Sequence, residues 1–320
     1  MKGEDSAAQE SVRREETCFL RRTGEHTMAF QLENLEILAR GGEADLYILD
    51  ENRILRVLRK EDPHALEREK AVMPLLDEAC VSVPRIYEYT EVEGNQAEVM
   101  ERIKGETMLE FMLSHPFSLK RKVREFAKIH QQILFLHGGK PLPSIQEKLA
   151  AFEEQPGKVE GEIFDFVMQI ARGLPSGDSF CHGDFHPGNI LMNERAPYVI
   201  DWSGVHTGSA LSDIAHTYVL MTHAPQTPGQ DARSYRKVRF FAHRIAKLYL
   251  RDMEKWEWFD WEEFRRWKIV MTHMMDCPRS KRRENRSCEK RMRSLAGASA
   301  RNGQSFFPIV KIVKKGKKSK

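Results

Sequence analysis

The chain has 320 residues, of which 41% are hydrophobic and 31% are charged. This length accommodates about two domains, and the composition excludes fibrous, coiled-coil and disordered proteins. Basic residues exceed acidic ones by four, but residues 279–320 hold 15 of the 51 basic residues and only 2 of the 47 acidic ones. The rest of the chain is therefore net acidic, so it repels a polyphosphate backbone and permits a cationic small molecule. Nucleic acid is not expected as a partner, apart from weak contacts of the basic tail.

Neither a membrane span nor an export signal is expected. No stretch approaches the roughly 18 consecutive apolar residues that a membrane helix needs, and the first residues lack a basic leader followed by an apolar segment. We therefore predict a cytoplasmic protein. The cysteines are odd in number and far apart, which favours reduced thiols over a disulfide framework or a structural zinc site. They are Cys18, Cys80, Cys181, Cys277 and Cys288.

The first third of the chain predicts a small sheet. Residues 1–27 are polar without a sustained apolar period, which predicts a flexible extension. Strands are predicted at residues 35–39, 45–49, 53–58, 86–92 and 97–103. Between the third and fourth strands a helix should begin near Asp62 and Pro63. Residues 28–103 are therefore expected to form a small lobe with an antiparallel sheet and one helix.

Helical periodicity dominates the rest of the chain. Helices are predicted at residues 118–137, 145–154, 161–172, 211–222 and 232–252. Residues 104–278 should form a larger, mainly helical lobe, and residues 279–320 a basic, disordered tail. The predicted fold class is α+β, with two lobes.

One stretch carries residues suited to catalysis. Residues 180–191 read F-C-H-G-D-F-H-P-G-N-I-L, and residues 198–202 read Y-V-I-D-W. Glycine and proline prevent a regular helix here, so a tight loop flanked by short apolar strands is expected. Phosphoryl transfer needs a carboxylate that orients and deprotonates an acceptor hydroxyl, and oxygen ligands that hold Mg²⁺ on the phosphates. Asp184, Asn189 and Asp201 provide such a set.

The spacing of these residues matches a known catalytic loop. Asp184 and Asn189 are separated as in the catalytic loop of protein kinases, and Asp201 follows an apolar strand like their metal-binding aspartate. H-G-D-F-H-P-G-N followed by I-D-W resembles the aminoglycoside phosphotransferase and choline kinase-like family, which has the protein-kinase-like fold. The resemblance implies that Asp184 is the catalytic base, that Asn189 and Asp201 bind Mg²⁺, and that ATP or GTP is the phosphoryl donor. It also implies that Asp213 supports the loop by hydrogen bonds, with His182 in a similar supporting position.

The small lobe carries a weaker part of the resemblance. Residues 37–47 are similar to the family's nucleotide loop, in which Gly41 and Gly42 let backbone N–H groups approach phosphates. Arg56 occupies the position of the phosphate-holding lysine, although the two side chains are not interchangeable, and Glu69 fits the helix glutamate that would pair with it. Without the resemblance, the glycine pair is a hairpin turn and Glu69 a solvated charge. The hinge that would meet adenine comprises Met100, Glu101, Arg102 and Ile103.

The acceptor pocket is expected where family members differ, in the remainder of the helical lobe. Tryptophans and carboxylates alternate near residue 258, and both attract ammonium groups. The candidate acceptor-binding residues are Glu257, Trp258, Asp260 and Trp261. The alternative is an amphipathic helix with an aromatic face toward the core and a solvated acidic face.

The predicted function is thus ATP-dependent transfer of a phosphoryl group to a small hydroxyl-bearing molecule, such as an aminoglycoside, choline, a sugar or an amino alcohol. Two alternatives remain. His182, Asp184 and His186 have the H-x-D-x-H spacing of metal ligands and would suit a zinc- or iron-dependent hydrolase. Arg56 in the lysine position would suit a nucleotide-binding pseudokinase.

Overall fold

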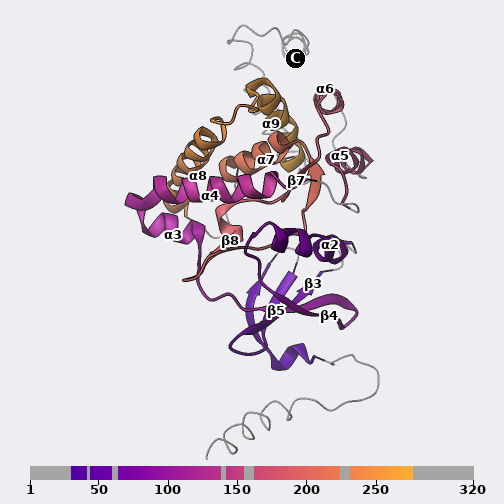
Figure 1. Ribbon diagram of the computed structural model, residues 1–320, viewed down its shortest axis with the longest axis vertical. Coiled ribbons are helices and arrows are strands. Elements are labelled where there is room, and N and C mark those ends of the chain that lie inside the picture. Colours follow the sequence, from indigo (N-terminus) through magenta and orange to yellow (C-terminus); the bar gives the residue numbers. More distant parts are fainter. Residues whose placement is uncertain are drawn as a thin grey trace, which may run out of the picture. The chain divides into compact units, whose positions relative to one another are not determined.

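The computed structural model describes residues 30–41, 44–59, 64–137, 142–154, 162–223 and 231–276 (Figure 1). The described chain divides into two compact units, one made of residues up to 59 and 85–102, the other of 64–84 and 103–276. The predicted extension 1–27 and tail 279–320 lie outside the described residues. So do Cys18, Gly42, Cys277 and Cys288.

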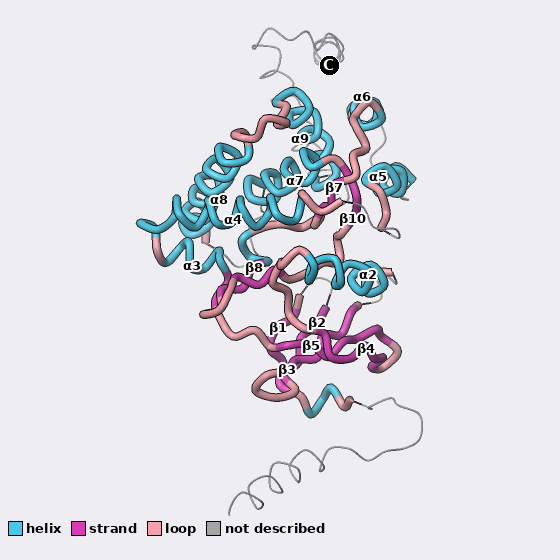
Figure 2. Tube along the Cα trace, in the orientation of Figure 1, coloured by secondary structure: helices cyan, strands magenta, loops and turns pink. Residues whose placement is uncertain are grey.

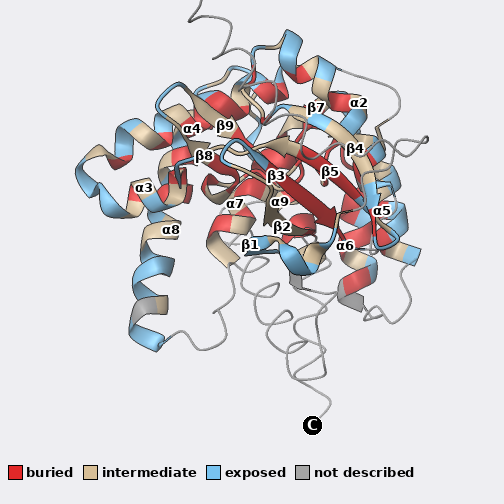
Figure 3. Ribbon diagram, turned by 90° about the horizontal axis from the view of Figure 1, so that it is seen from below, coloured by how far each residue is buried: buried red, intermediate tan, exposed pale blue. Residues whose placement is uncertain are grey.

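The first unit is a five-stranded antiparallel sheet. Its strands are β1 (Glu36–Arg40), β2 (Ala44–Ile48), β3 (Arg53–Leu58), β4 (Ile86–Val92) and β5 (Asn95–Glu101), in the order β1-β2-β3-β5-β4. The alternation of apolar residues places Leu55, Val57 and Val99 on one face in a common cluster. Arg56 therefore points to the opposite face, and β3 is buried along most of its length (Figure 3). The β4–β5 turn uses positive φ at Glu93 and Gly94.

The second unit is mainly helical, and the described residues show no helix that meets the length and apolarity needed to cross a bilayer. Its helices are α2 (Ala65–Glu78), α3 (Met108–Ser114), α4 (Leu119–Leu134), α5 (Ile145–Glu154), α6 (Glu162–Arg172), α7 (Ala210–His223), α8 (Ala232–Met253) and α9 (Trp261–Asp276). Figure 2 shows the helices gathered in this unit and the larger sheet in the other. Helix α7 packs against α8 and α9, and α4 packs against α8. As its period predicts, α4 buries Val123, Phe126, Ala127, His130 and Ile133.

Two small sheets in this unit frame the motif. Strand β6 (Glu106–Thr107) pairs with β8 (Ile190–Met192), which pairs with β9 (Pro197–Val199). Strand β7 (Ser179–Cys181) pairs with β10 (His206–Gly208). The loop between β7 and β8 ends in a 3₁₀ turn at Pro187–Asn189. The motif is thus a loop between two short strands, each anchored in its own sheet.

Helix α2 groups with the second unit, whereas the predicted lobe boundaries, 28–103 and 104–278, assign it to the first. Two hydrogen bonds join α2 and the segment after it to the rest of the second unit. Arg68 of α2 donates from Nη2 to the carbonyl of Ser203 at 2.9 Å, and the amide of Val199 donates to the carbonyl of Ser82 at 2.9 Å. The division of the chain into functional lobes stays a prediction.

Candidate active site

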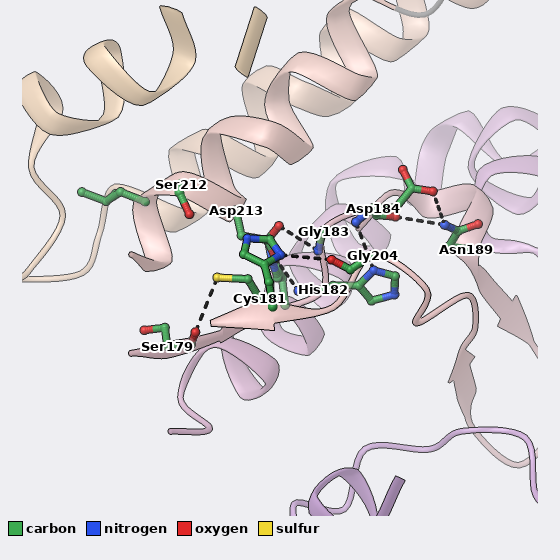
Figure 4. Close-up of polar contacts among 12 residues, drawn as sticks. Ser179, Cys181, His182, Gly183, Asp184, Asn189, Gly204, Ser212 and Asp213 are labelled. Carbon is green, nitrogen blue, oxygen red and sulfur yellow. Dashed lines mark hydrogen bonds and ion pairs between the residues drawn. The ribbon is translucent and has the colours of Figure 1, made fainter. Parts of the chain in front are cut away.

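Asp184 and Asn189 contact each other directly within the loop (Figure 4). The side-chain nitrogen of Asn189 donates to the backbone carbonyl of Asp184 at 2.9 Å and to its carboxylate Oδ2 at 3.0 Å. Both acceptors are oxygens without protons, so the amide nitrogen must face Asp184. The amide Oδ1 of Asn189 is therefore the atom directed away from Asp184.

Asp201 is brought to the same place by the β8–β9 ladder. Ile190 pairs with Val199, and one step beyond this pair the amide of Ile200 donates to the carbonyl of Asn189 at 3.0 Å. Asp201 follows Ile200 with a φ of 65°, a left-handed conformation that is rare for residues other than glycine. Its Oδ1 accepts a hydrogen bond from the Ser203 hydroxyl at 2.9 Å. The three predicted oxygen-bearing residues thus come from adjoining segments.

Asp213, at the start of α7, holds the beginning of the loop. Its Oδ2 accepts from the backbone amide of His182 at 2.8 Å, and its Oδ1 from that of Gly183 at 3.1 Å. Asp213 is buried, and burial alone would raise its pKa. The hydrogen bond and the charge of His130 outweigh burial, so the pKa of Asp213 is lowered far below its ordinary value. The carboxylate that receives the two loop amides is therefore ionised.

A buried chain of polar groups extends from Asp213 to two further helices. Nε2 of His130, on α4, lies 3.0 Å from Oδ2 of Asp213, and the Tyr249 hydroxyl, on α8, lies 2.6 Å from Nδ1 of the same ring. Since the ionised Asp213 can only accept, His130 donates from Nε2. Sequence reasoning missed both partners. The one available signal was a histidine among the apolar residues of the inward face of α4.

His182 ties the loop to the segment before Asp201. Its Nδ1 accepts from the backbone amide of Asp184 at 3.2 Å, so its Nε2 donates to the carbonyl of Ile200, also at 3.2 Å. Burial lowers the pKa of His182, which keeps the ring neutral at neutral pH. The ring also packs against the indole of Trp202, with centroids 4.5 Å apart.

Two glycines allow the loop to approach the segment after Asp201. Gly183 has a φ of +79°, and a Cβ on it would lie 2.2 Å from the carbonyl oxygen of Gly204. That oxygen also accepts a hydrogen bond from the ammonium of Lys148, on α5, at 2.7 Å. Any side chain at Gly183 would therefore push the two segments apart.

The Asp184 carboxylate is ionised at neutral pH. Partial burial raises the pKa of Asp184, but the interaction with His186, whose Nε2 lies 3.7 Å from Oδ2, outweighs burial, and the pKa is lowered below its ordinary value. The His186 ring is oriented by its Nδ1, which accepts from the amide of Gly188 at 3.0 Å. An ionised carboxylate is the form that a general base requires.

The histidines of this loop do not form a metal centre. Both ring nitrogens of His182 are used in hydrogen bonds to backbone groups of Asp184 and Ile200, and no group of three or more His, Cys, Asp or Glu side chains among the described residues is arranged to hold a metal ion. This geometry argues against the hydrolase alternative, which needs His182, Asp184 and His186 as joint ligands.

The predicted nucleotide-binding residues lie mainly in the first unit. Gly41 is at the β1–β2 turn, where its amide donates to the carbonyl of Ala44 at 2.9 Å. Arg56 donates from Nη1 to Oε1 of Glu98 at 2.8 Å, a contact that sequence reasoning missed. Glu69 is buried on α2, in the other unit, so its pairing with Arg56 stays a prediction.

The predicted hinge begins at the end of β5. Met100 and Glu101 are its last residues, and the amide of Arg102 donates to the carbonyl of Asn52 at 2.8 Å. Ile103 follows and is the first residue of the hinge that belongs to the second unit. A contact of this segment with adenine stays a prediction.

The four candidate acceptor-binding residues lie between the end of α8 and the first turn of α9. Asp260 accepts the amide of Glu263 at 2.7 Å, so it caps the N-terminus of α9. Trp261 packs against Phe264 and is 39% exposed, and Trp258 is 42% exposed. Within the described residues, no hydrogen bond or ring contact joins Glu257, Trp258, Asp260 or Trp261 to the loop of Asp184, and their role stays a prediction.

Comparison with known proteins gives both a family and a fold. The sequence profile described as the phosphotransferase enzyme family matches residues 34–267. No curated protein sequence matches the chain. The solved aminoglycoside-3'-phosphotransferase of type VIII superposes with a TM-score of 0.54 at 16% identity, over 75% of this chain and 93% of its own. Amicoumacin kinase hAmiN, solved with AMP-PNP, Ca²⁺ and Ami, gives 0.52 at 15% identity, over 93% and 97%. The predicted α+β, protein-kinase-like fold is confirmed.

Proposed function

The chain belongs to the phosphotransferase enzyme family, and from this premise we propose that it transfers the γ-phosphoryl group of ATP to a hydroxyl of a small molecule through Asp184. The family assignment confirms the predicted enzyme class, a small-molecule kinase. The site residues, the metal and the acceptor belong to the proposal.

One observation carries the proposal. The Asn189 amide holds the Asp184 carboxylate by a 3.0 Å hydrogen bond while its own backbone carbonyl binds the residue before Asp201. A single residue, Asn189, therefore contacts the base through its side chain and the segment that carries Asp201 through its backbone. In the reaction Asp184 accepts the proton of the acceptor hydroxyl as its oxygen attacks the γ-phosphorus, and ADP leaves.

The residues present fit a magnesium ion. Mg²⁺ prefers oxygen ligands, and this site offers the carboxylate of Asp201 and the amide Oδ1 of Asn189, which is directed away from Asp184. Bound there with ATP, the ion would neutralise charge on the phosphates. Asp184 then remains the base, and His182 and Asp213 fix the backbone that carries it.

The acceptor proposed is a small hydroxyl-bearing molecule with a positive charge. Outside residues 279–320 the chain has more acidic than basic residues, and the predicted acceptor residues Glu257, Trp258 and Trp261 combine carboxylate with aromatic surface. Aminoglycosides, choline and amino alcohols have this chemistry, and neutral sugars are the comparison class for the assay.

Replacement of Asp184 tests the catalytic proposal. We expect Asp184→Asn to lower kcat at least ~10²-fold, because the base is lost while the contact with Asn189 retains an oxygen acceptor. ATP consumption and phosphorylated product are measured against aminoglycosides, choline, sugars and amino alcohols. Asp178→Asn is the matched control, since that side chain is 81% exposed and lies before the loop. An unchanged rate in Asp184→Asn would remove the proposed mechanism.

The pseudokinase alternative has support in one observation, the buried contact of Arg56 with Glu98 where the family has a lysine. The same assay separates the two functions. Thermal stabilisation by ATP and Mg²⁺ without product from any acceptor would favour the pseudokinase.

A further inference from the structure

Arg56 and Glu98 form a buried ion pair within the sheet. They are directly opposite each other on β3 and β5, so their side chains share one face. Nη1 of Arg56 lies 2.8 Å from Oε1 of Glu98, and their side chains are 9% and 0% exposed. Glu98 is thus the acidic partner of Arg56 inside the first unit, independent of how α2 is positioned.

A buried ion pair at this place is costly, and packing alone does not explain it. Removing two charges from water carries a desolvation penalty that apolar residues of similar volume would avoid. The neighbours on either side, Ile54 and Leu58, are buried apolar residues on the same face. An apolar pair at 56 and 98 would therefore complete this surface without the penalty, which indicates a role beyond packing.

The chemistry of arginine suggests that role. A guanidinium has five N–H donors in a planar fork, and contact with Glu98 uses Nη1. Because the donors of one fork can bind several acceptors at once, contact with Glu98 is compatible with contact between Arg56 and a phosphate oxygen. A carboxylate held in the sheet would fix the plane of the Arg56 guanidinium. An arginine without such a partner loses side-chain entropy when it binds a phosphate.

Resting on the proposed function, we infer that Glu98 is a positioning residue that orients Arg56 to bind the phosphates of ATP, and that the two residues together replace the usual lysine. Glu98 itself touches no nucleotide in this arrangement. The pair then acts as a unit, and exchange of one member alone gives a worse site than exchange of both.

The test measures equilibrium binding of AMP-PNP with Mg²⁺, which requires no acceptor, with adenosine as a probe that lacks phosphates. Glu98→Gln keeps the shape and an oxygen for Arg56 but removes the charge. We expect it to weaken AMP-PNP binding roughly tenfold, the lower end of what loss of a supporting partner costs, and to leave adenosine binding unchanged. Glu91→Gln, at an exposed position on β4, is the matched control.

The decisive comparison is between backgrounds. In Arg56→Lys, we expect the compact ammonium to pair with the Glu98 carboxylate, which neutralises its charge. The affinity for AMP-PNP should therefore fall. In that background Glu98→Gln frees the ammonium, and the double variant should bind AMP-PNP more tightly than Arg56→Lys alone. The same substitution at residue 98 thus has opposite effects with arginine and with lysine at 56.

A merely structural pair gives a different pattern. The inference would be overturned if the double variant bound AMP-PNP more weakly than Arg56→Lys does. It would also be overturned if Glu98→Gln weakened the binding of AMP-PNP and of adenosine equally. If Glu98→Gln does not fold, the two lysine-background variants decide alone. Wild-type protein that binds no AMP-PNP would instead refute the proposed function. A different outcome is that the wild-type protein binds AMP-PNP and shows phosphotransfer that requires Asp184, while Glu98→Gln leaves the affinity for AMP-PNP unchanged. In that case only this inference fails and the proposed function stands.

Discussion

At the scale of single residues, His206 couples folding to pH. Its Nδ1–H donates to the carbonyl of Gly204 at 3.0 Å, and burial, aided by the charge of Lys148, lowers its pKa from 6.5 to about 3. The folded protein therefore keeps this ring neutral, whereas the unfolded chain binds a proton below pH 6.5. Protonation of the unfolded chain therefore lowers the stability of the fold as pH falls below about 6.5, by roughly 1 kcal/mol per pH unit from this residue.

The corresponding prediction concerns His206→Asn, whose side-chain nitrogen can still donate to Gly204 but does not titrate. We expect a lower free energy of unfolding at pH 7.5, because the smaller side chain leaves space, but a smaller loss between pH 7.5 and pH 5.5 than in the wild type. Urea unfolding at the two pH values measures both quantities. An equal pH-dependent loss in the two proteins would show that His206 does not control acid stability.

At the scale of elements, the site depends on close contact between the loop after β7 and the segment after β9. Gly183→Ala would place a methyl group 2.2 Å from the Gly204 carbonyl at a φ of +79°, so we expect destabilisation by about 1–3 kcal/mol and loss of most phosphotransfer activity. Gly173→Ala is the matched control, because the nearest atom to its Cβ would be the end of the flexible Arg266 side chain at 3.0 Å, with backbone atoms no closer than 3.6 Å. Thermal unfolding and the ATP assay are measured together. Wild-type activity in Gly183→Ala would mean that this contact does not position Asp184.

The same scale shows what sequence could predict. Amphipathic helix α4 and the strands of the larger sheet were predicted to within a few residues, because their periodic patterns are long enough to specify both type and face. Helix α3 and strands β6, β7 and β10 were missed, since two to seven residues carry too little periodicity. Helix α2 was assigned to the small lobe from chain order, but its hydrogen bond to Ser203 cannot be read from sequence.

The candidate site divides in the same way. The loop that carries Asp184 and Asn189 was predicted, since local spacing encodes it. The polar partners His130, Tyr249 and Glu98 were not, because each meets its partner across 42 or more positions of sequence. Asp260, predicted as an acceptor residue, also caps α9, a role that its position before an amphipathic segment was sufficient to suggest.

At the scale of the whole molecule, the predicted nucleotide-binding residues Gly41, Arg56 and Met100 belong to one unit and the predicted magnesium ligands Asn189 and Asp201 to the other. Saturation with ATP and Mg²⁺ at 100 times Kd should stabilise the chain by about 2.7 kcal/mol. In Asp201→Asn, ATP with EDTA should stabilise the fold as much as in the wild type. Replacing EDTA by Mg²⁺ should add no further stabilisation in this variant, whereas it should in the wild type. Scanning calorimetry measures both. An Mg²⁺ increment that survives in Asp201→Asn would exclude Asp201 as a ligand.

Trp202 gives this enzyme a natural optical probe. Trp202 is 1% exposed, and its indole contacts the ring of His182. His182 lies two residues before Asp184 in the chain. With the other tryptophans replaced by phenylalanine, emission from this single indole would follow the packing of the loop without any attached dye. Spectral shifts on mixing with nucleotide would then report, in real time, how fast the loop adjusts.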